Sequence, residues 1–351
     1  MWYRLLLALL CLHQGLPAQK QAADADPQAL TQRALAALSA QQYAEAIKQL
    51  ERAHRLAPEN LSITFNLGLA YFRAGRCANA IAPLKRAVSD PKSAEKARFL
   101  LGASYYQLGK YTLAATELER LRSNPEYAEN ALYLLEESYR KSRNGAQAER
   151  AFSDLLSRYP DSALVHKLLG TAYDSQGNFR EALAEMQKAA QRDPGLPEVK
   201  FGIGLLYLKL HDDVAARKAL DEELAANPCF AAALYYVGEI ERRANQLPAA
   251  AESYRKAIRC QPDNADAHLA LGITLQAQGE DAEPLRMFRR AAQLAPDKSE
   301  PHFQLARALA KSGQAEEGRR ELEKARQLAA SKDAKDVADI QRSGGDSKPE
   351  K

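Results

Sequence analysis

The sequence of 351 residues has little charge of one sign, and tryptophan and methionine are scarce in it. It contains one tryptophan and three methionines, and its 49 basic and 45 acidic residues leave a net charge of only +4. A protein whose main partner is nucleic acid or an anionic membrane needs a larger positive excess, so we exclude those partners. Alanine-rich segments such as 231–233 and 249–251 favour helices over strands.

Long apolar runs are also missing after residue 20. The apolar run Leu5–Leu12 is about half the roughly 17–25 residues that span a membrane. Arg4 precedes it and Pro17-Ala18 follow it, which is the three-part layout of a secretory signal peptide. We expect a signal peptide over residues 1–18, a short linker over 19–26, and a mature chain that has no membrane span and is exported to a bacterial periplasm or beyond. A membrane anchor is the alternative that the short run disfavours.

The remaining sequence repeats with a period of 34 residues. Nine repeats start at residues 27, 61, 95, 129, 163, 197, 231, 265 and 299 and cover 27–332 without insertion. Counted within a repeat, position 8 is glycine in six, position 15 is glycine in five and position 32 is proline in six; these residues suit close helix packing, turns and helix ends. Apolar spacing such as that of Leu169 and Tyr173 predicts two amphipathic helices per repeat. Pro83 is expected to kink or delay the second helix of its repeat.

This unit resembles the tetratricopeptide repeat, whose first helix carries Leu-Gly-x-x-Tyr and whose second helix carries alanine before a proline. Leu67-Gly68 with Tyr71 matches it, as does Leu169-Gly170 with Tyr173, and position 20 is alanine in seven repeats. The tryptophan that the family carries at position 4 is replaced in all nine. The resemblance implies an all-α fold, a right-handed superhelical solenoid of nine helix-turn-helix repeats. A C-terminal helix extension and a disordered tail are expected over 333–351.

Constellations that carry chemistry are missing. Three histidines, His166, His268 and His302, occupy position 4 and are expected to face the packing between helices rather than to bind a metal. Glutamates on the helices indicate solvated faces, as at Glu117, Glu119, Glu136 and Glu137. We therefore predict a protein that is not an enzyme and needs no cofactor.

The mature chain has three cysteines, an odd number for an exported protein, so at least one thiol is free or pairs between chains. Cys229 and Cys260 fall near the ends of successive second helices. The sequence leaves open whether they form a disulfide or remain two unpaired thiols.

In the tetratricopeptide family, positions 2, 5, 9, 12 and 13 of the first helix line a concave groove that holds peptides or helices of partner proteins. Here these positions gather aromatic and basic residues, the residue types that dominate interface hot spots. The alternative is that the aromatic residues only pack neighbouring first helices. The candidate partner-binding residues, centred on repeats 6 and 7, are Phe201, Lys209, Tyr235, Arg242 and Arg243, with Phe65, Phe72, Arg73, Tyr106, Tyr133 and Arg140 in earlier repeats.

The sequence thus predicts an exported scaffold that binds protein or peptide partners in its groove. The alternative function is an enzyme-associated or enzymatic envelope protein acting in polymer or lipoprotein biogenesis. A catalytic domain would need about 100 residues outside the repeats, and the mature sequence has only 19–26 and 333–351 there. The oligomeric state is not predicted.

Overall fold

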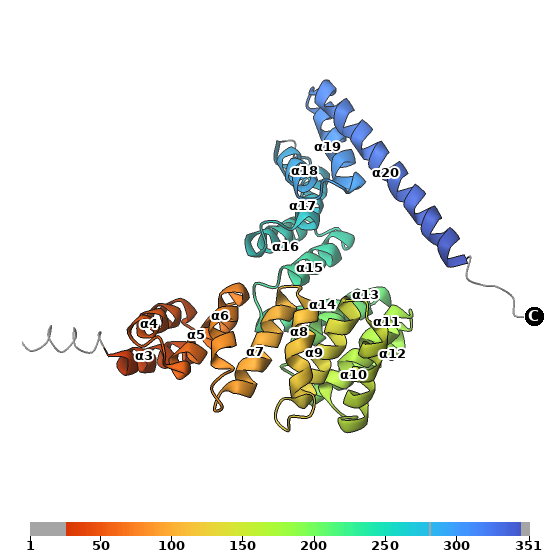
Figure 1. Cartoon of the computed structure of the whole chain (residues 1–351). Coiled ribbons are helices and arrows are strands. Elements are labelled where there is room, and N and C mark those ends of the chain that lie inside the picture. The colour runs from red at the N-terminus through yellow and green to blue at the C-terminus, as the bar shows by residue number, and fades with distance from the viewer. Residues whose placement is uncertain (1–25, 281, 345–351) are drawn as a thin grey trace, which may run out of the picture. The chain divides into compact units, whose positions relative to one another are not determined.

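A computed structural model describes residues 26–280 and 282–344, with side chains as far as Ser331. The expected signal peptide, most of the linker and residues 345–351 lie outside the described residues. Within that range the regular structure is helical throughout, with eighteen α-helices and one short 3-10 helix (Figure 1). The prediction of an all-α repeat fold is therefore confirmed.

The chain divides into two compact units, residues 1–165 and 166–351, and the division falls inside α11 (Ala163–Ser175). The helices of the first unit are α3 (Pro27–Ser39), α4 (Tyr43–Leu56), α5 (Leu61–Arg73), α6 (Cys77–Ala87), α7 (Ala94–Gln107), α8 (Tyr111–Leu118), η1 (Glu119–Leu121), α9 (Ala128–Lys141) and α10 (Gly145–Arg158). Those of the second unit are α12 (Phe179–Arg192), α13 (Val199–Lys209), α14 (Asp213–Ala226), α15 (Ala231–Arg243), α16 (Leu247–Cys260), α17 (Ala265–Ala277), α18 (Ala282–Leu294), α19 (Ser299–Lys311) and α20 (Ala315–Gly344).

Consecutive helices pack as hairpins, one hairpin per repeat. The first and second helices of a repeat contact each other, for example α5 with α6, α15 with α16 and α19 with α20. Within each unit second helices also contact the first helix of the next repeat, as α6 does with α7 and α16 with α17. Where the first helices begin, the side chains of Asp26, Asn60 and Asn264 accept hydrogen bonds from first-turn amides and satisfy donors that a helix start leaves free.

The turn inside each hairpin explains the glycines at position 15. All nine residues at this position have positive φ: five are glycine, with φ between 70° and 84°, and four are Gln41, Arg143, His211 and Asn245, with φ between 57° and 61°. Glycine adopts this left-handed conformation without the steric cost that a side chain brings. The prediction that position 15 is a turn is confirmed.

The glycines at position 8 mark the closest approach between the two helices of a hairpin. A Cβ atom on Gly238 would lie 2.6 Å from Cε1 of Tyr254, and one on Gly272 would lie 2.6 Å from Cε1 of Phe288. Tyr254 and Phe288 are completely buried, so the space that glycine leaves is filled by a large side chain sixteen residues later. The seven alanines at position 20 are buried in the same seam.

Two helix boundaries differ from the sequence expectation. Pro83 does not delay α6, which begins at Cys77 and includes the proline; the helix ends at Ala87, earlier in its repeat than α12 or α16. At the other end of the chain α20 continues to Gly344 (Figure 1), beyond the point where the sequence indicated a tail. No helix among the described residues is both long enough and apolar enough to cross a membrane.

Candidate functional site

The candidate residues occupy positions 5, 12 and 13 of first helices, and in each unit we call the side of the first helices that carries positions 2, 5, 9, 12 and 13 the A-helix face. Six of them belong to the first unit and five to the second. In the first unit they come from α5, α7 and α9, and these successive helices contact one another. In the second unit they come from α13 and α15.

Aromatic rings connect α13 to α15 and α16. The ring of Phe201 lies 4.9 Å from that of Phe230 and 5.9 Å from that of Tyr236, while Tyr235 lies 5.2 Å from Tyr236 and 5.8 Å from Tyr254. We call these five residues the aromatic cluster. Phe201 and Tyr235 are half-buried, so both pack between repeats and both also present part of their rings at the surface. The two interpretations drawn from the sequence, packing and surface lining, therefore each describe part of these side chains.

Glu239 joins the aromatic cluster to Arg242. Tyr254 donates a hydrogen bond from its hydroxyl to Glu239 Oε1 at 2.6 Å, and Arg242 donates from Nη2 to Glu239 Oε2 at 2.8 Å. Burial alone would raise the pKa of Glu239, but the hydrogen bonds from Arg242 and Tyr254 outweigh burial and lower it. Burial raises the pKa of the nearby Tyr235 to about 12. The face thus presents an ionised Glu239 paired with Arg242 beside a neutral phenol.

Arg243 and Lys209 point to other partners. Arg243 pairs with Asp213 on α14 at 3.1 Å and lines a crevice of about 430 Å³ with Val214, whose side chain is 83% exposed. Lys209 pairs with Asp174 on α11 at 2.5 Å, and its ammonium group lies 5.2 Å from the centre of the Phe179 ring. The structure therefore brings Phe201, Tyr235 and Arg242 together, whereas Arg243 and Lys209 each contact the preceding repeat.

In the first unit two of the candidate residues, Tyr106 and Arg140, contact a buried acidic pair, Glu136 and Glu137. Tyr106 on α7 donates a hydrogen bond from its hydroxyl to Glu137 Oε2 at 2.9 Å. Arg140 pairs with Glu137, and its Nε lies 3.3 Å from Glu136 Oε1. Both glutamates are only 8% exposed. The expectation that they lie on a solvated face is wrong, because Glu137 is bound by Tyr106 of α7 and Glu136 stands at position 8, where the two helices of a hairpin approach most closely.

Glu136 is the more unusual of the two carboxylates. It occupies position 8, where six repeats have glycine, and its Oε2 is buried without a hydrogen-bond partner. Burial, followed by the charge of Glu137, raises its pKa to about 7, although Arg140 acts in the opposite direction. Burial and the charge of Glu137 also raise the pKa of Tyr106. Sequence reasoning missed this site, but the register of the repeat could have found it, since no other repeat places a charge at position 8.

The other first-unit candidates form a more open part of the A-helix face. Phe65 and Phe72 are half-buried on α5, Arg73 is exposed at the end of that helix, and Tyr133 is half-buried on α9. The ammonium group of Lys96 lies 5.9 Å from the centre of the Phe65 ring. This part of the face resembles the second unit in combining half-exposed rings with cations.

The histidines at position 4 serve the packing of hairpins, as predicted. Nδ1 of His166 lies 2.6 Å from Glu185, and Nδ1 of His302 lies 2.5 Å from Glu321, in both cases a residue nineteen positions later. Met287 stands at that place after His268, which leaves the buried Nδ1 of His268 without a partner. The described residues contain no group of His, Cys, Asp or Glu side chains that could hold a metal.

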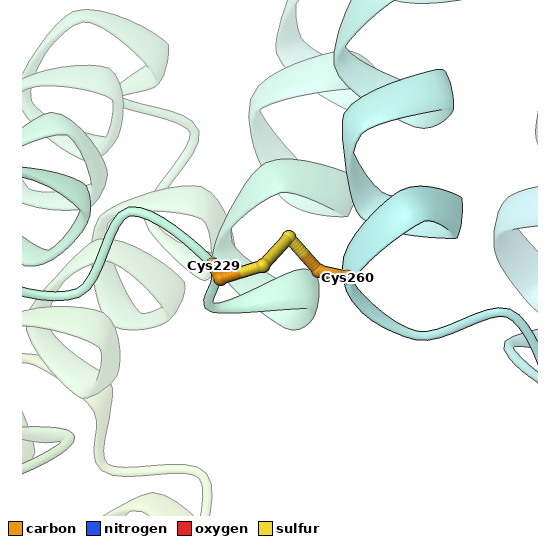
Figure 2. Close-up of a disulfide and its surroundings, with 2 residues drawn as sticks. All are labelled: Cys229 and Cys260. Atoms are coloured by element: carbon orange, nitrogen blue, oxygen red, sulfur yellow. A yellow bond between two sulfur atoms is a disulfide. The ribbon is translucent and has the colours of Figure 1, made fainter. Parts of the chain in front are cut away.

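The structure settles the alternative that the sequence left open for the cysteines. Cys229 and Cys260 form a disulfide, which ties the loop before α15 to the end of α16 (Figure 2). Phe230, a member of the aromatic cluster, directly follows the first cysteine. Cys77 is a buried free thiol whose Sγ donates to Gln107 Oε1 at 2.7 Å.

The array of hairpins, with its seam at position 8 and its left-handed turn at position 15, defines a helical repeat protein. Profiles described as tetratricopeptide repeats match residues 133–197, 238–279 and 299–324, and the profile of the anaphase-promoting complex, cyclosome, subunit 3, matches residues 39–121. These matches, together with the all-helical repeat fold, support a tetratricopeptide repeat protein. No curated protein matches the sequence significantly.

Solved structures share the fold at low sequence identity. A chain of the Cut9-Hcn1 hetero-tetramer of the anaphase-promoting complex aligns with a TM-score of 0.60 and 14% identity, over 82% of this chain and 56% of that one. A tetratricopeptide repeat protein from Parabacteroides merdae aligns with a TM-score of 0.53 and 19% identity, over 71% of this chain and 98% of that one. This chain thus spans little more than half of the Cut9-Hcn1 chain, and at these identities the likeness describes the fold alone.

Proposed function

We propose that this protein is an exported scaffold that binds protein partners on the A-helix face and carries out no reaction itself. The observation that carries the proposal is the aromatic cluster, in which Phe201 and Tyr235 are half-buried and Glu239 links Tyr254 to Arg242. Aromatic and arginine side chains in a partly desolvated setting make the largest contributions to protein interfaces. Because hairpin packing already fixes the rings, a partner would order few side chains on binding.

The ion pairs on the A-helix face support a more specific proposal for the chemistry of the partner. Arg242 is already paired with Glu239, and Arg243 with Asp213, so an acidic ligand would have to compete with these carboxylates. An apolar or aromatic anchor seated on Phe201 and Tyr235 has no such competitor. We therefore propose that an apolar anchor supplies most of the affinity and that the arginines orient polar groups beside it.

Two independent features support export. The first is the signal-peptide pattern of residues 1–18. The second is the disulfide between Cys229 and Cys260, since disulfides persist in oxidising compartments such as the bacterial periplasm and are rare in the cytosol. Sequencing the N-terminus of exported material tests this point. A mature chain beginning near Gln19 is expected, and a cytoplasmic product that retains Met1 would contradict it.

No observation favours the alternative of an envelope enzyme, because neither the matched families nor the solved structures supply an enzymatic function. The profile and structural likenesses to anaphase-promoting complex subunits carry no partner over to this chain, since the structural likeness is limited to the fold.

Partner binding is tested with the mature chain immobilised and exposed to an envelope extract, followed by calorimetric titration of the retained partner. Tyr235→Ala is expected to weaken binding by about 1–3 kcal/mol. The matched control is Lys256→Glu, an exposed residue on α16, which should leave affinity unchanged. If Tyr235→Ala remains folded and binds as tightly as the wild type, the aromatic cluster serves packing only.

A further inference from the structure

The hairpin formed by α19 and α20 is the last of the described array. The face that the preceding hairpin buries against α19 is open in this last hairpin. In that preceding hairpin, α17 and α18 present four apolar residues to α19 at positions 5, 9, 21 and 24. They pack against Leu305, Ala308 and Leu309 of α19. The four covered residues are Leu269, Ile273, Leu285 and Phe288.

The same four positions in the last hairpin line an open groove. They are occupied by Phe303, Arg307, Arg319 and Leu322, and the groove has a volume of about 390 Å³. Small residues such as Ala306 and Gly318 form its floor. Phe303 is 39% exposed, a large value for a ring at a position that the next helix covers elsewhere. The groove therefore has the shape of a helix-packing surface.

The groove differs from the covered one in charge. Arginines replace Ile273 and Leu285, and the guanidinium of Arg307 lies 5.8 Å from the centre of the Phe303 ring. Arg319 pairs with Glu316 across two side chains that are more than 70% exposed, an arrangement worth little in water. An apolar floor flanked by two arginines is complementary to an apolar stripe flanked by carboxylates.

We propose that this end face is a docking site for an acidic amphipathic helix of a partner protein. The covered hairpin indicates the apolar stripe that such a helix needs, since α19 contacts its neighbour through Leu305 and through Ala308 and Leu309, which follow it by three and four residues and so share one helix face. Glutamates or aspartates beside that stripe would pair with Arg307 and Arg319. This surface is separate from the aromatic cluster and does not depend on its function.

A second copy of this chain is a poorer occupant. Head-to-tail stacking would place α3 on the groove, and its residues equivalent to Leu305 and Leu309 are Arg33 and Ala37. Arg33 would then face Arg307 and Arg319, and like charges brought together oppose association. Ala37 also offers much less apolar area than leucine.

The test uses the mature full-length chain and two labelled helical peptides of about 15 residues, with fluorescence anisotropy as the readout. Both peptides carry leucine, alanine and leucine at the spacing of α19, flanked by glutamates in one and by lysines in the other. The acidic peptide is expected to bind about tenfold or more tightly than the basic one. The double variant Arg307→Glu with Arg319→Glu should reverse this preference.

Three variants, each checked for folding by circular dichroism, locate the binding. Phe303→Ala should weaken the acidic peptide about tenfold, whereas Arg320→Glu, an exposed change on α20 that does not line the groove, should have no effect. Tyr235→Ala should also have no effect, which separates this site from the aromatic cluster. The proposal is overturned if the two peptides bind equally or not at all, if Tyr235→Ala abolishes binding, or if the chain self-associates through this face and excludes the peptide.

Discussion

Tyr254 on α16 and Glu239 on α15 are joined by a hydrogen bond of 2.6 Å from the phenol hydroxyl to Oε1. The ring of Tyr254 is completely buried and fills the space beside Gly238. One residue thus closes the seam of a hairpin and also fixes the carboxylate that pairs with Arg242 on the A-helix face. Packing and the candidate site are coupled at this point.

Tyr254→Phe tests that coupling. The ring and its packing remain, but Glu239 loses a charge-assisted hydrogen bond, so we expect the free energy of unfolding to fall by about 1–2 kcal/mol. Urea unfolding followed by circular dichroism measures the change. The exposed Lys256→Glu variant should stay within about 0.5 kcal/mol of the wild type, and an equal loss in both variants would contradict the assignment.

Glu136 should make stability depend on pH. Its pKa is raised to about 7 in the folded chain and lies near 4.3 when unfolded. Between these values the folded state holds a proton that the unfolded state has lost, so the free energy of unfolding decreases as pH rises through that window and is level outside it. Glu136→Gln should remove the decrease and exceed the wild type by about 3–4 kcal/mol at pH 8, with little difference at pH 4.

The groups facing Glu136 are Glu137 and Arg140 on α9, with Tyr106 on α7 bound to Glu137. The control for the pH experiment is Glu149→Gln, an exposed glutamate on α10, which should keep the wild-type profile. Thermal unfolding at several pH values distinguishes the two variants. A Glu136→Gln profile parallel to that of the wild type would show that the carboxyl does not titrate differently on folding.

The left-handed turn residues that are not glycine offer a stabilising substitution. His211 has a φ of 61°, and His211→Gly should raise the free energy of unfolding by about 0.5–1 kcal/mol because glycine adopts this conformation without strain. Lys218→Gly, in the exposed interior of α14, should lower it by about 1 kcal/mol. Opposite signs in urea unfolding are expected, and a loss in both variants would contradict the strain argument.

The disulfide between Cys229 and Cys260 closes a segment with a sequence separation of 31. Removing it with Cys229→Ser and Cys260→Ser should cost about 3 kcal/mol, chiefly by freeing the unfolded chain. Reductant should lower the melting temperature of the wild type and of Cys77→Ala but leave the double variant unchanged. Peptide mapping without reduction should recover the 229–260 linkage, and its absence from exported protein would contradict the assignment.

The repeat made most of the fold predictable from the sequence. Glycine at position 8 marks the tight helix seam and glycine at position 15 marks the left-handed turn, so a period of 34 residues was enough to place the hairpins. Side-chain direction was harder to predict, because one backbone position allows several rotamers. Arg242 and Arg243 are neighbours in sequence, yet one pairs within α15 and the other reaches α14.

Burial of single charged residues was the other limit. Glu136 looks like an ordinary helix-surface glutamate until its register is counted, because position 8 lies where the two helices of a hairpin approach most closely. The pairing of Cys229 with Cys260 likewise depends on how two successive hairpins approach, which the repeat pattern left open.

Partner binding at the aromatic cluster of the A-helix face is tested by site-specific photo-cross-linking, with a photoreactive residue placed at Tyr235 or at Lys256 in the full-length protein inside cells. We expect a discrete cross-linked partner from Tyr235 that Phe201→Ala diminishes, and none from Lys256. Cross-linking from Lys256 but not from Tyr235 would contradict it.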